Sequence, residues 1–289
     1  MNSVVLKKRK STKQENVLQQ LWQDPLGRMG FIGVAIIVLM AIFAPLIAQF
    51  DVAQIHSADA LQAPNATYWF GTDNFGRDIF SRIVYGARVS LVVGIVSVSI
   101  AAGIGFVLGL AAGYFEGKTE TVIMMVMDVL FAFPSILLAL LIVAVLGPSI
   151  INTMIAIGIV NIPVFTRTVR ASVKSIKGLD YIANAKSIGL KDSKILFSHI
   201  APNSLAAFTV QATLALSSGI LTEATMSFLG LGIQPPAPSW GSMLSEARVY
   251  MELAPWMVIF PILFIVLTIL SFNILGDALR DVLDPKLKL

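Results

Sequence analysis

The sequence lacks cysteine altogether and is poor in histidine and in charged residues. Without cysteine the chain can form no disulfide and no cysteine-ligated zinc or iron–sulfur site. His56 and His199 are too few to build a histidine metal site. Charged residues make up 13% of the chain, whereas a soluble domain carries about a quarter. These shortages argue against both a metal centre and an ordinary soluble fold.

Apolar residues take the place of the missing charges. They form 56% of the 289 residues, and the mean hydropathy is +0.80. A soluble fold could not hide so much apolar surface from water, whereas a lipid bilayer would solvate it. A helix that crosses a bilayer needs about 20 mostly apolar residues. Six such runs are present: Met29–Phe50, Val89–Phe115, two that share Thr121–Thr166 and separate at Gly147–Pro148, about Pro202–Leu231, and about Pro255–Gly276.

The positions of the basic residues predict how these runs are oriented. If the N-terminus is cytoplasmic and the runs alternate in direction, 17 of the 21 Lys and Arg residues fall in cytoplasmic segments. Such an excess of cytoplasmic cations is the usual pattern of multi-pass membrane proteins. The four exceptions are Arg77, Arg82, Arg88 and Arg248. The sequence therefore predicts an all-α integral membrane protein with six transmembrane helices and both termini cytoplasmic.

Residues 1–28 form a polar cytoplasmic leader before the first apolar run. The run that begins at Met29 has no small-residue cleavage pattern, so it is not a removable signal peptide. The basic residues at 7–10 would lie near anionic lipid headgroups. One face of a helix here would carry Val17, Leu18, Leu21 and Trp22. This pattern is typical of an interfacial helix, and an unstructured tail is the equal alternative.

Two polar segments lie between the apolar runs. Residues 51–88 follow the first helix, 29–50, and form an extracytoplasmic loop. The remainder, 89–289, is expected to be one transmembrane domain, with a long cytoplasmic loop at about 167–201. Neither loop is large enough to be a separate domain of ordinary size.

The cytoplasmic loop has the pattern of two short helices that meet at Gly189. Glycine adopts the positive φ that ends a helix, and Asp192 or Ser193 could cap the next one. Residues spaced three or four apart form one face of the first helix: Tyr181, Ala185 and Ile188. Such a loop either rests on the bilayer or docks a soluble protein.

Three stretches of sequence resemble a known family. They are FGTDNFGRDIFSR followed by GARVSL at 70–82 and 86–91, SFLGLGIQPPAPSWGSML at 227–244, and NILGDALRDVLDP at 273–285. They resemble the second permease subunit of dipeptide, oligopeptide and nickel importers in the ATP-binding cassette (ABC) family. The resemblance extends over residues 22–285. It implies the transmembrane domain of a type I ABC importer in a prokaryotic cell membrane.

The cytoplasmic loop resembles the Glu-Ala-Ala loop of the same permeases. Ala185, Gly189 and Pro202 match that pattern, whereas Ala183 stands in place of its Glu and Asn184 in place of its first Ala. By this resemblance the loop forms a coupling helix that sits in a groove of an ATPase subunit. The coupling residues would be Asp180, Tyr181, Ala183, Asn184, Ala185, Gly189, His199 and Pro202.

The resemblance also implies partners. They are a homologous first permease subunit, two ABC ATPase subunits, an extracytoplasmic substrate-binding protein and membrane lipid, with no nucleic acid. ATP and Mg²⁺ would bind to the ATPase subunits, and this chain would hold no cofactor, metal or catalytic residue. Residues 117–119 read Gly-Lys-Thr, as at the end of a phosphate-binding loop. Ala112 stands where that loop needs glycine, and the segment follows a membrane helix, so a polar turn is the better interpretation.

Two carboxylates, Asp128 and Glu223, lie inside apolar runs. A charge in the bilayer costs about 2.5–3.5 kcal/mol on insertion scales, so such residues usually face a partner or a lumen. Glu223 shares its run with other polar residues: Gln211, Ser217 and Ser218. This series could line a substrate pathway. We favour the alternative, in which these side chains form hydrogen bonds between helices.

The function that follows is transport of peptides by alternating access, driven by ATP hydrolysis on separate subunits. A nickel or metal-chelate importer is the alternative substrate class, because the same signatures occur in both. A different class, a secondary transporter driven by an ion gradient, would need its own coupling site of carboxylates and broken helices at mid-membrane. Two isolated carboxylates give that alternative little support.

Overall fold

The computed structural model describes residues 17–283, so the basic residues at 7–10 lie outside the described part. The regular structure of that part is helical, and its β-type pairing is limited to one isolated bridge between Thr72 and Asp78. The helices are α1 Val17–Gln23, α2 Pro25–Ile42, α3 Ala44–Ile47, η1 Ser57–Asp59, α4 Ile79–Tyr114, α5 Lys118–Phe131, α6 Ser135–Leu146, α7 Ile150–Lys177, α8 Asp180–Ser187, α9 Asp192–Ile195, η2 Leu196–Ile200, α10 Ala201–Phe228, α11 Trp240–Ala247 and α12 Trp256–Leu283.

Five helical stretches of the described part are long and apolar enough to cross a membrane. They are α2, α4, α7, the continuous stretch Asp192–Phe228 that contains α10, and α12. The third predicted run is instead a pair of shorter helices, α5 and α6, with an 87° bend between them. If this pair crosses as one broken span, the number of crossings rises to six.

Two prolines have different effects on the membrane helices. Pro134 is the N-cap residue of α6 and follows directly on the break after α5. Proline disfavours the helical conformation in the residue before it, which explains a helix end there. Pro163 lies inside α7, which continues from Ile150 to Lys177. This second proline therefore does not end its helix.

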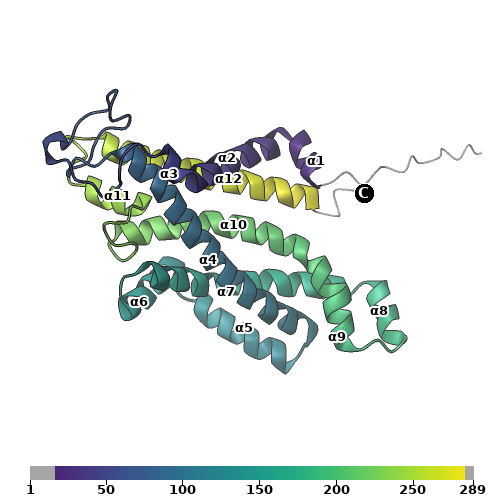
Figure 1. Ribbon diagram of the computed structural model, residues 1–289. Helices are drawn as coiled ribbons and strands as arrows, with labels where there is room; N and C mark the ends of the chain where they lie inside the picture. The colour runs from purple at the N-terminus through teal and green to yellow at the C-terminus, as the bar shows by residue number, and fades with distance from the viewer. Residues whose placement is uncertain (1–16, 284–289) are drawn as a thin grey trace, which may run out of the picture.

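The helices connect two opposite ends of the molecule (Figure 1). One end holds α1, α8, α9 and the last turns of α12, and the other holds α3, α11 and the loop before α4. Helix α4 crosses between the ends and begins at Ile79, well before the expected start at Val89, because Asp78 caps it there. Helix α7 likewise continues to Lys177, so the loop expected from residue 167 begins only at Gly178.

Small residues let α4 and α7 pack with their backbones close together. A Cβ added at Gly105, Gly109 or Gly113 of α4 would come within 2.4–2.6 Å of a side-chain carbon of α7. Gly94 of α4 faces α10 in a looser contact. Glycine series in membrane helices usually allow such close contacts. Gly103, on the same helix, is an exception, because a Cβ added there would meet nothing within 4 Å.

The N-terminal helices pack on the end of α12. The Asp24 carboxylate accepts a hydrogen bond from the Gly27 amide at 2.6 Å and so caps α2. A helix is present at Val17–Gln23, where the apolar pattern predicted one. Leu21 is buried, whereas Trp22 is 54% exposed and meets Phe31 edge-on. An amphipathic helix thus lies at the same end of the molecule as α8 and α9.

Candidate coupling surface and pathway residues

Two helices at one end of the molecule, α8 and α9, form the predicted pair around Gly189. Gly189 has φ +82°. Its amide donates to the Lys186 carbonyl at 3.0 Å, and the Leu190 amide donates to the Ala185 carbonyl at 3.2 Å. These two bonds are the usual C-terminal motif of a helix that ends at a glycine. The sequence therefore predicted both the pair of helices and the turn between them.

The start of the second helix differs from the prediction. The N-cap residue of α9 is Lys191, with no side-chain capping bond. Asp192 lies in the first turn, and its carboxylate accepts a hydrogen bond from the Tyr114 hydroxyl at 2.5 Å. The expectation that Asp192 or Ser193 caps the helix is therefore wrong.

The inner face of this pair is fixed to the membrane helices. Ile182, Ile195 and Ile200 are at most 4% exposed. They belong to one apolar cluster with Leu110 and Tyr114 near the end of α4 and with Val169 and Val173 near the end of α7. The other buried members of the cluster are Ala185, Leu196 and Ala201. Closely packed apolar clusters transmit displacement because they do not compress easily. A push on α8–α9 would therefore move the ends of α4 and α7.

The outer face of the pair carries most of the predicted coupling residues. Exposed members are Asp180, Tyr181, Ala183, Asn184, Gly189 and Pro202. The Tyr181 and His199 rings lie 6.5 Å apart, and Asn203 donates to the His199 carbonyl at 2.5 Å. Ala185 is buried, so the predicted face of Tyr181, Ala185 and Ile188 is wrong. The side chain of α8 that is buried together with Ala185 is Ile182.

Exposed apolar side chains on the same surface were not predicted as site residues. Ile188 is 79% exposed and Phe197 is 67% exposed, and Leu179 adds a third apolar side chain. We call the exposed residues of 179–199 the coupling surface. Large apolar groups left in water are typical of a surface that binds another protein. In the sequence, the signal for this surface was the presence of Leu179, Ile188 and Phe197 among polar residues.

The polar series on α10 does not share one face. Ser217 and Glu223 are buried, Gln211 is half-buried, and Ser218 is exposed and donates to the carbonyl of Ala215 on its own helix. The hydroxyl of Ser217 is buried without a hydrogen-bond partner among the described residues. The structure thus separates the residues that were considered together as a pathway lining.

Glu223 instead connects two helices. Its side chain is fully buried, and its carboxylate accepts hydrogen bonds from Ser90 of α4 at 2.9 Å and from Ser227 at 2.8 Å. The Ser227 hydroxyl also accepts from the amide of Ile233, which follows α10. Buried carboxylates need such donors because their desolvation is costly. Hydrogen bonding between helices, the alternative favoured from the sequence, is present within this chain.

Asp128 also meets another helix. Its carboxylate lies 2.6 Å from the Arg167 guanidinium of α7, and that guanidinium covers the Phe131 ring at 4.2 Å. Further along the same two helices, Glu120 pairs with Arg170 and Lys174. These contacts join α5 to α7 in the half that approaches α8.

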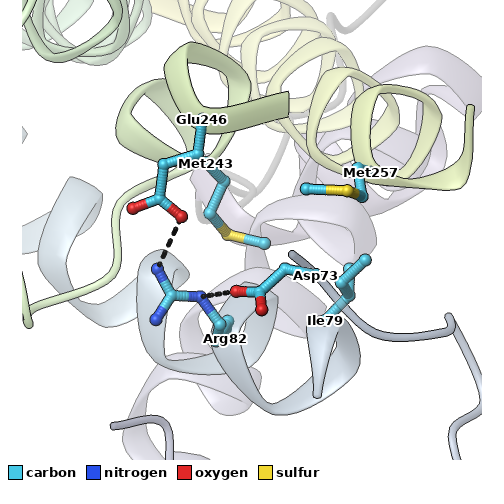
Figure 2. Close-up of a pocket in the computed structure, with 6 residues that line it drawn as sticks. All are labelled: Asp73, Ile79, Arg82, Met243, Glu246 and Met257. Atoms are coloured by element: carbon cyan, nitrogen blue, oxygen red, sulfur yellow. Dashed lines mark ion pairs between the residues drawn. The ribbon is translucent and has the colours of Figure 1, made fainter. Parts of the chain in front are cut away.

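The opposite end of the molecule contains a ring of four charges. Figure 2 shows the Arg82 guanidinium between the carboxylates of Asp73 and Glu246, at 3.7 and 3.8 Å. Arg77 contacts the same two carboxylates at 2.5 Å each. Arg82 also donates to the Val52 carbonyl at 3.0 Å. The ring fixes the loop before α4 to α11. Asp73, Arg82 and Glu246 of the ring also line a small pocket, together with Ile79, Met243 and Met257 (Figure 2).

The residues around this ring differ in exposure. Arg88 is exposed, whereas Arg77 and Arg82 are 6% and 2% exposed. Arg77 and Arg82, the two arginines that pair with carboxylates, are therefore not solvated loop charges. Asp78 accepts from the Ser81 amide at 2.8 Å, and burial raises the pKa of its carboxyl while the hydrogen bonds to Ser81 oppose that rise. It acts as the cap of α4.

Groups that could hold a metal or a phosphate are scarce in this fold. Among residues 17–283 no cluster of three or more His, Asp or Glu side chains could hold a metal ion. Gly117 has φ +76° and directly precedes α5, at the end of a long membrane helix. A phosphate-binding loop follows a strand. Here the turn at 115–117 follows helix α4, and Lys118 and Thr119 already belong to α5.

Comparison with known proteins identifies the family. Residues 105–289 match the model of the binding-protein-dependent transport system inner membrane component, and residues 15–64 match that of the N-terminal transmembrane domain of oligopeptide transport permease C. The chain belongs to this family of importer permeases. The permease is thus a multi-pass protein of the inner membrane, and the resemblance noted in its sequence is confirmed.

Curated relatives of this permease cover nearly all of its length. A dipeptide transport system permease protein of Alkalihalophilus pseudofirmus is 50% identical over 93% of this chain and 89% of its own. A glutathione transport system permease protein of Pectobacterium atrosepticum is 48% identical over 88% of this chain and 85% of its own. A glutathione permease of Escherichia coli is 49% identical over 88% and 84%. The family assignment favours an ATP-driven importer over an ion-gradient-driven transporter.

Proposed function

We propose that this permease forms, with a homologous first permease subunit, the pathway by which peptides enter the cell. The proposal rests on its similarity to a dipeptide permease and to glutathione permeases. That similarity favours peptides over the alternative substrate, nickel or a metal chelate. An extracytoplasmic binding protein would deliver the substrate, and membrane lipid would surround the two permeases.

The proposed topology has six crossings with both termini in the cytosol. It treats α5 and α6 as one broken span, and the even number of crossings then returns the chain to the side on which it began. Two observations support it. The ends of α1 and α12 lie at the same end of the molecule as α8 and α9 (Figure 1), and the positively charged loops lie on that side.

ATP and Mg²⁺ would bind to two ABC ATPase subunits, and this chain would carry no catalytic residue. The coupling surface would dock on one ATPase subunit. A single observation carries this proposal: the segment 179–200 exposes Tyr181, Ile188 and Phe197, while its buried residues are packed into the ends of α4 and α7. A conformational change of the ATPase could therefore displace the membrane helices by moving this segment. The substrate would have to interact differently with the two resulting states.

Substitution of Gly189 tests the docking. A side chain at Gly189 meets nothing within 4 Å in this chain, so it would project where the ATPase would sit. Gly189→Trp should abolish co-purification of the ATPase or stop peptide uptake. Gly189→Asn should retain most of both, because asparagine tolerates positive φ and is small.

Gly117→Trp is the matched control. Gly117 also has positive φ, also meets nothing within 4 Å, and lies in the α4–α5 turn outside the coupling surface. The Gly117→Trp substitution also places a side chain at a positive φ, but it does not obstruct α8–α9. If Gly189→Trp and Gly117→Trp reduced association and uptake equally, strain rather than docking would explain the loss, and the proposal would be wrong.

A further inference from the structure

Tyr114, the last residue of α4, makes a direct bond to the coupling element. Its hydroxyl donates to the Asp192 carboxylate of α9 at 2.5 Å. The residue is only 8% exposed because its ring lies in the apolar cluster beneath α8 and α9. A hydrogen bond to a carboxylate is shorter and stronger than one between neutral groups, and it is directional. The end of α4 is thus held by a defined atom of the cytosolic helix pair.

The end of α7 meets the same tyrosine. Lys177, the last residue of α7, donates to the Tyr114 carbonyl at 3.0 Å and lies 5.5 Å from the centre of its ring. The Lys177 ammonium also pairs with Glu116 at 3.1 Å. Helices α4, α7 and α9 therefore meet at one residue, Tyr114.

The Asp192 carboxylate is not needed by its own helix. The N-cap position of α9 is Lys191, which makes no side-chain capping bond. An aspartate at this place usually serves its own helix terminus, as the sequence suggested. Here the Asp192 side chain accepts its hydrogen bond from Tyr114 of α4 instead. The bond therefore connects two elements and is not a local cap.

Helix α4 connects this bond with the opposite face of the membrane. It has 36 residues, which correspond to a rod of about 54 Å. Near its other end Arg82 belongs to the four-charge ring with α11. Next to it, the Ile83 carbonyl accepts a hydrogen bond from the Trp240 indole at 3.0 Å, again from α11. Both ends of α4 are thus fixed to elements outside the membrane.

We propose that the Tyr114–Asp192 bond is the joint through which displacement of the coupling surface reaches α4, and that α4 carries it to the extracytoplasmic end. Tyr114 is then a positioning residue for transport and touches neither peptide nor ATP. This inference rests on the proposed docking of α8–α9. Without the bond, α8–α9 could still bind the ATPase and press on α4 through the apolar cluster, but no directional contact would fix the end of α4 to α9.

Tyr114→Phe in the assembled importer tests this inference. Phenylalanine keeps the ring in the apolar cluster and removes only the hydroxyl. In liposomes we expect the ATPase to remain bound and to hydrolyse ATP, while the peptide transported per ATP hydrolysed falls by about fivefold or more, the usual lower size of coupling between sites. Tyr85→Phe is the control. Tyr85 lies on the same helix, and its hydroxyl makes no hydrogen bond among the described residues, so the ratio should not change.

A double-mutant cycle with Asp192→Asn separates a joint from two independent effects. Asp192→Asn should lower the ratio in the same direction, and the double variant should transport no less per ATP than Tyr114→Phe alone. Losses that multiply in the double variant would overturn the inference. So would a Tyr114→Phe variant with a lower melting temperature and an unchanged ratio, since that is the mark of a purely structural bond.

The outcomes also separate this inference from the proposed function. If the unaltered chain binds no ATPase, or Gly189→Trp has no effect, the docking itself is wrong. If docking behaves as proposed and Tyr114→Phe leaves the ratio unchanged, only the joint is wrong and displacement enters through another contact.

Discussion

Gly109 of α4 lies directly against Val169 of α7. A Cβ added to Gly109 would lie 2.6 Å from the Val169 Cβ and 2.8 Å from the Thr166 carbonyl oxygen. The first neighbour is a branched side chain held by its own helix, and the second is backbone, so neither can move far. The two helices that meet at Tyr114 are therefore packed with almost no space between them.

Gly109→Ala should destabilise the permease. The added methyl forces α4 and α7 apart, and overpacking of this kind costs about 1–3 kcal/mol. Gly103→Ala is the control, because Gly103 on the same helix meets nothing within 4 Å. Unfolding of the two variants in detergent, followed by heat or denaturant, measures the difference. Equal stability of both would show that α4 and α7 are not in this contact.

Arg82→Met should also destabilise the permease, by a different mechanism. It leaves Asp73 and Glu246 with Arg77 as their remaining cation, in a ring where both arginines are almost fully buried. Breaking a buried ion pair on one side costs about 3–5 kcal/mol. Arg88→Met, at an exposed position, should change the unfolding free energy by less than about 0.5 kcal/mol.

Adding Glu246→Gln to Arg82→Met should restore part of that loss. The double variant again has one cation and one carboxylate in the ring, so no charge is left unbalanced. Non-additivity of this kind is expected for residues of one network. If the double variant were less stable than Arg82→Met alone, the ring would not be the electrostatic unit that its distances suggest.

Glu223→Gln should leave peptide uptake nearly unchanged. Glutamine has the same shape: its carbonyl oxygen can accept from one of the two hydroxyls, Ser90 or Ser227, and its amide can donate to the oxygen of the other. Glu223→Ala should lower the unfolding free energy by about 1–3 kcal/mol, because it leaves these buried hydroxyls without their acceptor. A large loss of uptake in Glu223→Gln, with normal stability, would instead indicate that the carboxylate acts in the pathway.

The sequence predicted the parts of this fold that depend on local chemistry. Apolar length marked the spans, and glycine at 189 marked the turn between α8 and α9. These features follow from residue type and spacing alone. The start of α4 was harder to predict, because Arg82 and Arg88 interrupt the apolar pattern there and the helix begins at the Asp78 cap, with Arg82 buried.

The candidate site was only partly predictable for the same reason. Which face of α8 points inward depends on the ends of α4 and α7, so Ile182 was missed and Ala185 was placed on the wrong side. The bond between Tyr114 and Asp192 joins residues 78 positions apart. A partner so distant in sequence leaves no periodic signal, and local capping was the only role that the sequence could suggest for Asp192.

Labelling of a single cysteine at Ile188 tests the central claim most directly. The chain contains no cysteine, and Ile188 is 79% exposed in the middle of the coupling surface, so Ile188→Cys would be the one reactive thiol of this subunit. In vesicles that contain the permease without its ATPase, a membrane-impermeant maleimide should label this thiol when the vesicles are inside-out and not when they are right-side-out. Labelling in right-side-out vesicles alone would place α8–α9 outside the cell, where no ATPase could reach it.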